Sequence, residues 1–97
     1  MSELKARLQS DLTEARKARE KVRISVLSMT LSELRNREIE LGGEADDAEV
    51  LSVVSKAVKR RKEAADQMRA GNRNDLAEKE SAEAEILSAL PLRPALH

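Results

Sequence analysis

The first part of the chain constrains the fold most, because residues 3–41 contain neither glycine nor proline. Apolar side chains recur there at intervals of three and four, the spacing that places them on one face of an α-helix. A single straight helix of this length would span about 57 Å, which is too long for a compact domain of this size. A compact monomer therefore needs a bend, and the polar run 16–21 is the expected place. Without a bend, the long helix would have to pair with a second chain.

An apolar stripe lies on each side of the expected bend. In the first part, leucines recur every fourth position from Leu4 to Leu12. The stripe of the second part is wider, which predicts that the second helix is the more buried of the two. Its members are Ile24, Leu27, Leu31, Leu34 and Leu41, with Val22, Val26 and Met29 on the flank.

Helix-end signals divide the rest of the chain. The glycine pair 42–43 ends the second helix, and such a short connection predicts antiparallel neighbours. Asp46 is the expected N-cap of a third helix, and Glu49 fits a capping box with it. Gly71 is expected to end that helix in the left-handed conformation. The sequence thus predicts an all-α, four-helix bundle-like single domain with helices at about 3–19, 21–41, 47–70 and 73–90.

Composition limits the kinds of function that the chain can have. Its 97 residues suffice for one domain, and the absence of Phe, Tyr and Trp requires an aliphatic core. Eighteen basic and eighteen acidic residues cancel, so net charge gives no sign of a nucleic-acid partner. There is no cysteine and therefore no disulfide framework. No segment approaches the roughly 20 apolar residues of a membrane span, so we expect a cytoplasmic protein without a membrane partner.

Two basic clusters are the candidate binding surfaces. One lies around Lys56 and the run Lys59–Lys62, and helical geometry places Lys56, Lys59 and Arg60 on one face. Such clusters either bind phosphates or simply solvate a helix face, and the pattern alone leaves both readings open. Without aromatic rings, any RNA binding would involve backbone and shape rather than stacked bases. The second cluster surrounds the expected bend and consists of Arg16, Lys17, Arg19, Lys21 and Arg23.

Motifs for catalysis or metal binding are missing from the pattern. A di-metal helical site would need Glu-x-x-His pairs, and the only histidine is His97. The serines Ser25, Ser28 and Ser32 have neither nucleophile-elbow glycines nor a histidine partner. The sequence also lacks a phosphate-cradling glycine loop. We therefore expect no metal, no cofactor and no catalytic residue.

Four runs of sequence carry a family resemblance. In their order and spacing they resemble the N-terminal helical domain of YqeY-like proteins, and they are LKARLQSDLTEARKAREKVRISVL, LRNREIE, DDAEVLSVVSKAVKRRKEA and GNRNDLAEKESAEAEIL. This is the GatB/YqeY family, similar to the tail region of the GatB subunit of Glu-tRNA/Asp-tRNA amidotransferase. The resemblance implies a helical domain over 1–91 in a bacterial cytoplasmic protein. It also implies a second small helical domain, which we expect this chain to lack, ending in a short extended tail over 92–97.

The resemblance also implies a function. In the GatB subunit the similar region helps engage tRNA, while the chemistry belongs to other domains. The chain departs from the family at Ser28, where an arginine is usual, and at Ala89, where a tyrosine is usual. We predict a non-catalytic module that binds tRNA or an acidic protein surface. The predicted binding residues are Lys17, Arg19, Arg23, Lys56, Lys59 and Arg60.

Two other functions remain as alternatives. One is a self-associating or protein-binding helical adaptor with no RNA partner, which the unbroken helical pattern and the balanced charge favour. The other is an amidotransferase-type carbon–nitrogen ligase with glutamine as amido donor, which the family naming suggests. The second ranks last, because no catalytic constellation is visible in the sequence.

Overall fold

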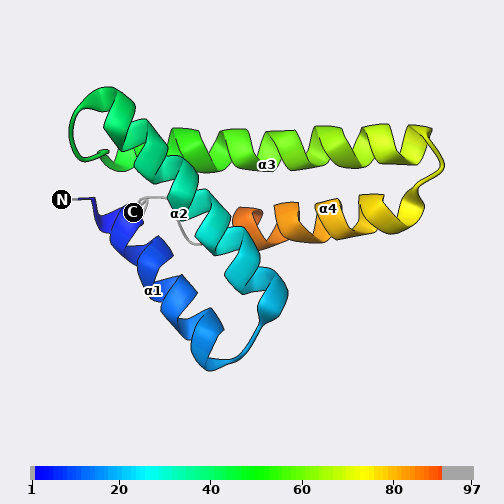
Figure 1. Ribbon diagram of the computed structural model, residues 1–97, viewed down its shortest axis with the longest axis horizontal. Coiled ribbons are helices and arrows are strands. Elements are labelled where there is room, and N and C mark those ends of the chain that lie inside the picture. The colour runs from blue at the N-terminus through cyan, green and yellow to red at the C-terminus, as the bar shows by residue number, and fades with distance from the viewer. Residues whose placement is uncertain (1, 91–97) are drawn as a thin grey trace, which may run out of the picture.

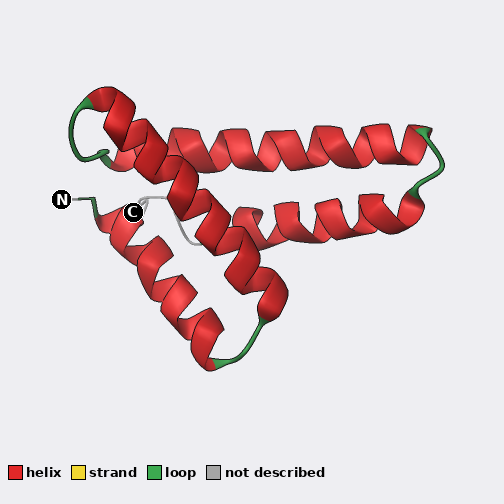
Figure 2. Cartoon of the chain, viewed as in Figure 1, coloured by secondary structure: helices red, strands yellow, loops and turns green. Residues whose placement is uncertain are grey.

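The computed structural model describes residues 2–90, which form four α-helices and their connections (Figure 1). Figure 2 shows helices and loops but no strand over this range, so the all-α prediction is confirmed. The expected tail over 92–97 lies outside the described residues. The helices are α1 (Glu3–Lys17), α2 (Lys21–Leu41), α3 (Asp47–Ala70) and α4 (Asn74–Ser88).

The four helices form two antiparallel hairpins that cross each other (Figure 1). α3 and α4 lie side by side along their length, whereas α2 crosses α3 obliquely and contacts α4 as well. The glycine connection therefore joins crossing helices rather than the antiparallel neighbours that its length suggested. This crossing places α2 between α1 and α3, with a groove on each side of it.

The predicted bend between the first two helices is confirmed at residues 18–20. Arg19 adopts a left-handed backbone with φ 57°, and the amide of Glu20 donates to the carbonyl of Ala15 at 3.0 Å. This is the hydrogen bond of a Schellman motif, which usually has glycine at the left-handed position. An arginine there carries a strain of roughly 1 kcal/mol, because its Cβ crowds the carbonyl oxygen. The chain thus ends α1 without a glycine.

The end of α3 differs from the prediction by one residue. Gly71 has φ −91°, and Asn72 is the left-handed residue with φ 60°. The amide of Arg73 then donates to the carbonyl of Met68 at 2.7 Å. Asparagine tolerates this conformation better than most residues, so α3 still ends at Ala70 while the left-handed residue falls one position after the expected glycine.

The starts of α1 and α3 are capped and tied together. Asp46 accepts from the amide of Glu49 at 2.9 Å, as predicted, but no capping box forms because Glu49 pairs with Arg37 instead. At α1, the Ser2 hydroxyl accepts from the amide of Lys5 at 3.1 Å and donates to the carboxylate of Asp47. This bond keeps the pKa of the Asp47 carboxyl below its ordinary value. This hydrogen bond therefore joins the start of α1 to the first turn of α3.

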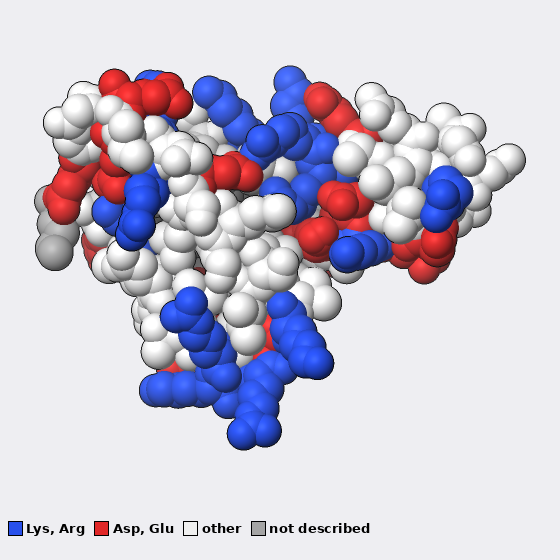
Figure 3. Space-filling view, viewed as in Figure 1, with Lys and Arg blue, Asp and Glu red and all other residues white. Residues whose placement is uncertain are grey.

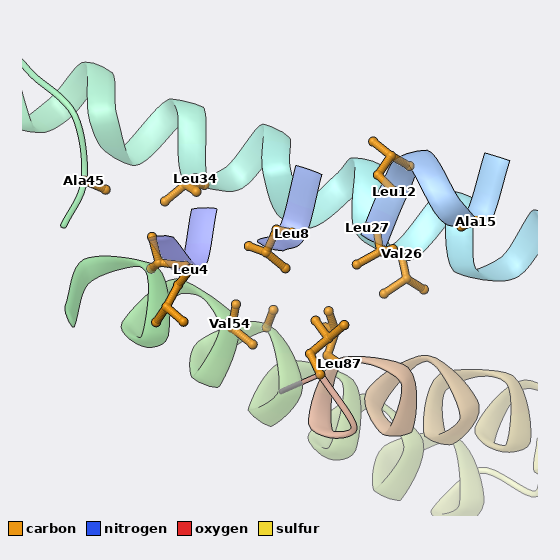
Figure 4. Packing of buried hydrophobic residues seen from close by; sticks show 13 residues of the cluster. Leu4, Leu8, Leu12, Ala15, Val26, Leu27, Leu34, Ala45, Val54 and Leu87 are labelled. Carbon is orange, nitrogen blue, oxygen red and sulfur yellow. The ribbon is translucent and has the colours of Figure 1, made fainter. Parts of the chain in front are cut away.

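The core lies where the two hairpins cross. Figure 4 shows labelled side chains from all four helices meeting there, among them Leu8, Leu27, Val54 and Leu87. Leu8 and Leu27 have no exposed surface. The core is aliphatic, as the composition requires, and one hydroxyl enters it: Thr30 is fully buried and donates to the Val26 carbonyl at 2.8 Å.

The predicted stripe of α2 is only partly confirmed. Leu27 and Leu34 are buried, but Val26 and Thr30 join them in place of Leu41. Leu41 is the last residue of α2, directly before the Gly42 C-cap, and lies outside the buried cluster. The apolar side chains left exposed are Val22 (51%), Met29 (53%), Ile39 (72%) and Leu41 (44%).

Candidate nucleic-acid interface

The structure separates the six predicted binding residues into two groups. Lys17, Arg19 and Arg23 lie at the α1–α2 turn, and the remaining three lie on α3. In Figure 3, basic side chains gather at the tip formed by the α1–α2 turn and again over α3. Uncharged surface separates the two gatherings in this view. The two basic clusters therefore do not form one continuous patch on this face.

The cluster at the turn, hereafter the turn cluster, consists of Arg16, Lys17, Arg19, Lys21 and Arg23. All except the partly buried Arg23 are exposed. Arg23 pairs with Glu20 at 3.4 Å, and within residues 2–90 no other member of the turn cluster forms an ion pair. These cations are available to an external anion because the turn projects from the body of the molecule (Figure 1).

The α3 cluster lines a groove of about 530 Å³ between α2 and α3, hereafter the α2–α3 groove. Arg60 pairs with Glu33 across the groove at 2.6 Å, and Lys59 approaches Glu63 at 4.0 Å. Lys56 is the exception, since it has no ion pair with a described residue. Carboxylates of the same chain thus neutralise most of the positive charge in this groove.

Arg37 also lines the α2–α3 groove, and its charge is paired as well. It donates to the carboxylate of Glu49 at 3.0 Å and to that of Glu40 at 3.2 Å. The Glu49 hydrogen bond raises the pKa of the Arg37 guanidinium above its ordinary value. The charge of Arg37 is therefore already balanced by carboxylates of the same chain.

Arg61 is a basic residue whose role the sequence pattern did not reveal. It is 7% exposed, and its guanidinium donates to the Ala57 carbonyl at 3.2 Å and contacts the Met29 sulfur at 3.4 Å. Its position was readable in principle, because it lies four residues from both Ala57 and Ala65 on the buried stripe of α3. One member of the basic run is consequently part of the interior and cannot serve as a surface contact.

A second groove of about 610 Å³ lies between α1 and α2, hereafter the α1–α2 groove. Glu38 is the single carboxylate that lines it within residues 2–90, and it accepts from Lys5 Nζ at 2.9 and 3.0 Å and from the Ala45 amide at 2.9 Å. These hydrogen bonds keep the pKa of the Glu38 carboxyl below its ordinary value, and the bond from Ala45 has a larger effect than the bonds from Lys5. Arg16 and Arg35 line the same groove and form no ion pair with a described residue.

Two further features bear on the possible functions. No three His, Cys, Asp or Glu side chains in the described part of the chain are grouped to hold a metal ion. No helix in residues 2–90 combines the length and the apolar character that crossing a membrane requires.

Comparison with known proteins identifies the family. The family described as Yqey-like protein matches residues 5–92. The chain belongs to the YqeY-like family. An uncharacterized protein of Schizosaccharomyces pombe is 36% identical over 84 residues, which cover 87% of this chain and 68% of that protein. The resemblance found in the sequence is thus confirmed.

Other relatives of this YqeY-like chain are mitochondrial by name. "Altered inheritance of mitochondria protein 41, mitochondrial" of Saccharomyces cerevisiae is 32% identical over 81 residues, which cover 82% of this chain. The protein of that name from Lachancea thermotolerans is 32% identical over 83 residues, or 84% of the chain. The chain spans 44% of the length of each of these relatives. These relatives are fungal, so they give the expectation of a bacterial protein no support.

Proposed function

We propose that this YqeY-like chain is a non-catalytic module that binds tRNA through the exposed basic residues of its helical hairpins. The turn cluster carries the proposal, because four of its cations are exposed without an ion pair in the described part of the chain. Each such cation can neutralise a phosphate and release a bound counterion, which gives sequence-independent affinity. Lys17 and Arg19 are the principal contacts, and Lys56, Lys59 and Arg60 contribute less.

The conformation of Arg19 supports this assignment. A left-handed non-glycine residue is maintained at a cost, and such strain is often found at functional sites. Here the strained position carries a guanidinium at the tip of the turn, where glycine would be the less strained choice. The family resemblance to the tail region of GatB points to the same kind of ligand. With no aromatic residue in the chain, the contacts would be to phosphate and ribose rather than to stacked bases.

A second candidate function is a helical adaptor that binds protein or a second copy of itself. The exposed apolar side chains of α2 favour it, above all Ile39 at 72% exposure. Static light scattering over a wide concentration range tests self-association. A strictly monomeric species at high concentration would remove that form of the adaptor function.

The proposed module acts by binding and not by chemistry. Purified protein supplied with glutamine, ATP and misacylated tRNA is expected to show no amide transfer, and turnover would overturn this part of the proposal. We further propose a cytoplasmic location, which the absence of cysteine suits. A mitochondrial location is the alternative that the names of the yeast relatives suggest.

Titration of labelled tRNA into the purified chain tests the proposed function. Binding should be clear at about 50 mM salt and should weaken steeply by about 200 mM, because each phosphate contact adds roughly −0.9 to the log–log slope. Engagement of the four unpaired cations of the turn cluster would give a slope near −3.6. Absence of binding at the lower salt concentration would overturn the proposal.

A further inference from the structure

We propose that the α1–α2 groove holds a stretch of the RNA sugar–phosphate backbone, so that the binding surface continues from the turn cluster along the hairpin. This inference rests on the proposed function and specifies where the bound strand runs. Arg16 belongs to both features, because it is a member of the turn cluster and also lines the groove. The two surfaces are therefore continuous.

The charge balance of the groove favours an anionic ligand. Lys5, Arg16 and Arg35 line it, and among the described residues Glu38, whose ionised form Arg35 also favours, is its only lining carboxylate. Both oxygens of Glu38 already accept from Lys5, and one of them also accepts from the Ala45 amide. The positive charge of Arg16 and Arg35 is therefore left without a counter-charge in direct contact, and both residues are exposed.

Neutral polar side chains line the same groove as these arginines. The side chains of Gln9, Ser28, Ser32 and Asn36 line the groove and form no hydrogen bond with a described residue. Hydroxyl and amide groups of this kind supply many of the contacts to phosphate and sugar oxygens in protein–nucleic acid complexes. Their presence in one groove with Arg16 and Arg35 suits a chain of alternating phosphate and ribose better than a single small anion.

The floor of the groove is apolar. Leu12 is 8% exposed and Leu31 is partly buried, and both line the groove. A ribose can lie against these aliphatic carbons while its phosphates meet the flanking arginines. The groove thus offers all the contacts that a sugar–phosphate backbone needs without any base-stacking surface.

Paired charge-neutral variants test the groove. Arg16→Gln/Arg35→Gln should weaken the binding of labelled tRNA by about tenfold at low salt and reduce the salt slope by about 1.8, the equivalent of two contacts. The matched control Lys59→Gln/Arg60→Gln removes the same charge from the α2–α3 groove and should weaken binding less than about threefold. Circular dichroism and thermal melting verify that both variants remain folded.

A variant that should bind more tightly provides a second test, because unfolding of a variant could weaken binding but could not strengthen it. Ser28→Arg adds a guanidinium to the groove and should tighten tRNA binding several-fold, with a slope steeper by about one contact. Ser55→Arg adds the same charge at an exposed position of α3 outside the groove, so it controls for the added charge and should have a smaller effect. Equal tightening by the two arginines would overturn the proposal.

The outcomes separate this inference from the proposed function. If wild-type protein binds tRNA and Lys17→Gln/Arg19→Gln weakens binding while Arg16→Gln/Arg35→Gln does not, the groove proposal is overturned and the proposed function stands. If wild-type protein binds polyglutamate but not tRNA at low salt, both fall and an acidic protein surface becomes the ligand. If the groove variant and the turn variant each reduce the salt slope, both proposals are supported.

Discussion

The two grooves that flank α2 are both lined by basic side chains, but they differ in how those charges are paired. In the α2–α3 groove, Arg60 pairs with Glu33 at 2.6 Å and Lys59 approaches Glu63 at 4.0 Å. In the α1–α2 groove, Arg16 and Arg35 have no ion pair with a described residue. The comparison teaches that unpaired cations, and not the number of basic residues, indicate where an anion can bind.

The density of basic residues in the sequence points to the α2–α3 groove, where most of the cations are paired. The run Lys59–Lys62 is the densest basic stretch in the chain, yet one member is buried and two others approach glutamates. An exposed ion pair contributes little to stability, but it lowers the field that a phosphate would meet. Arg16, Arg19 and Arg35, which form no ion pair with a described residue, are therefore the better candidates.

The largest effect on tRNA affinity is expected from substituting two cations of the turn cluster. Lys17→Gln/Arg19→Gln should weaken tRNA binding by about tenfold or more at low salt, because two unpaired cations are lost from a projecting turn. Fluorescence anisotropy at several salt concentrations measures both the affinity and the slope. If the matched variant Lys59→Gln/Arg60→Gln weakens binding as much, pairing does not distinguish the two surfaces and the comparison fails.

The second prediction concerns the paired cations of the α2–α3 groove, which lose their ion pairs when the partner carboxylates are neutralised. Glu33→Gln/Glu63→Gln should free Arg60 and Lys59 and tighten tRNA binding by about threefold to fivefold, with a steeper salt dependence. The exposed pair Glu78→Gln/Glu85→Gln changes net charge equally without releasing a partner, so it is the control. Equal tightening by both variants would show that net charge, rather than local pairing, governs affinity.

A third prediction separates the strain at the turn from its charge. Arg19→Gly should raise the free energy of unfolding by about 1 kcal/mol, because glycine adopts the left-handed conformation without a Cβ clash. Arg19→Ala should give no such gain, and both variants should lower tRNA affinity to a similar extent. Urea denaturation measures the stability difference. A destabilised glycine variant would contradict the strain assigned to this residue.

The smallest expected effect concerns pH. The pKa values of Glu38 and Asp47 lie below their ordinary values of 4.5 and 3.8, so folding favours their ionised forms. Their contribution to stability is present at neutral pH and is lost as pH falls below those ordinary values toward the lowered native ones. The melting temperature of Glu38→Gln should therefore depend less on pH between about 5 and 3 than that of wild type.

Glu78→Gln serves as the control for that measurement, because Glu78 is exposed on α4. Its melting profile should follow that of wild type throughout the acid range. An unchanged pH profile in Glu38→Gln would show that the bonds from Ala45 and Lys5 do not couple folding to the ionisation of this carboxyl.

The sequence by itself determined the features that arise from neighbouring residues. Apolar spacing placed all four helices, and the caps at Ser2 and Asp46 and the bend near Arg19 followed from local hydrogen bonding. These features depend on residues within about one helical turn of each other, so a linear pattern contains them. Within residues 2–90 the predicted helix boundaries agree with the structure to within two residues.

Tertiary structure alone decided which basic residues remain available to a partner. Glu33 and Arg60 are 27 positions apart in the sequence, and Ser2 and Asp47 are 45 apart. Their pairing depends on the angle at which the two hairpins cross, and that angle follows from how the aliphatic core packs. Many pairings are compatible with the same helical pattern. The packed core selects one of them and leaves Arg16, Lys17, Arg19 and Arg35 without an ion pair among residues 2–90.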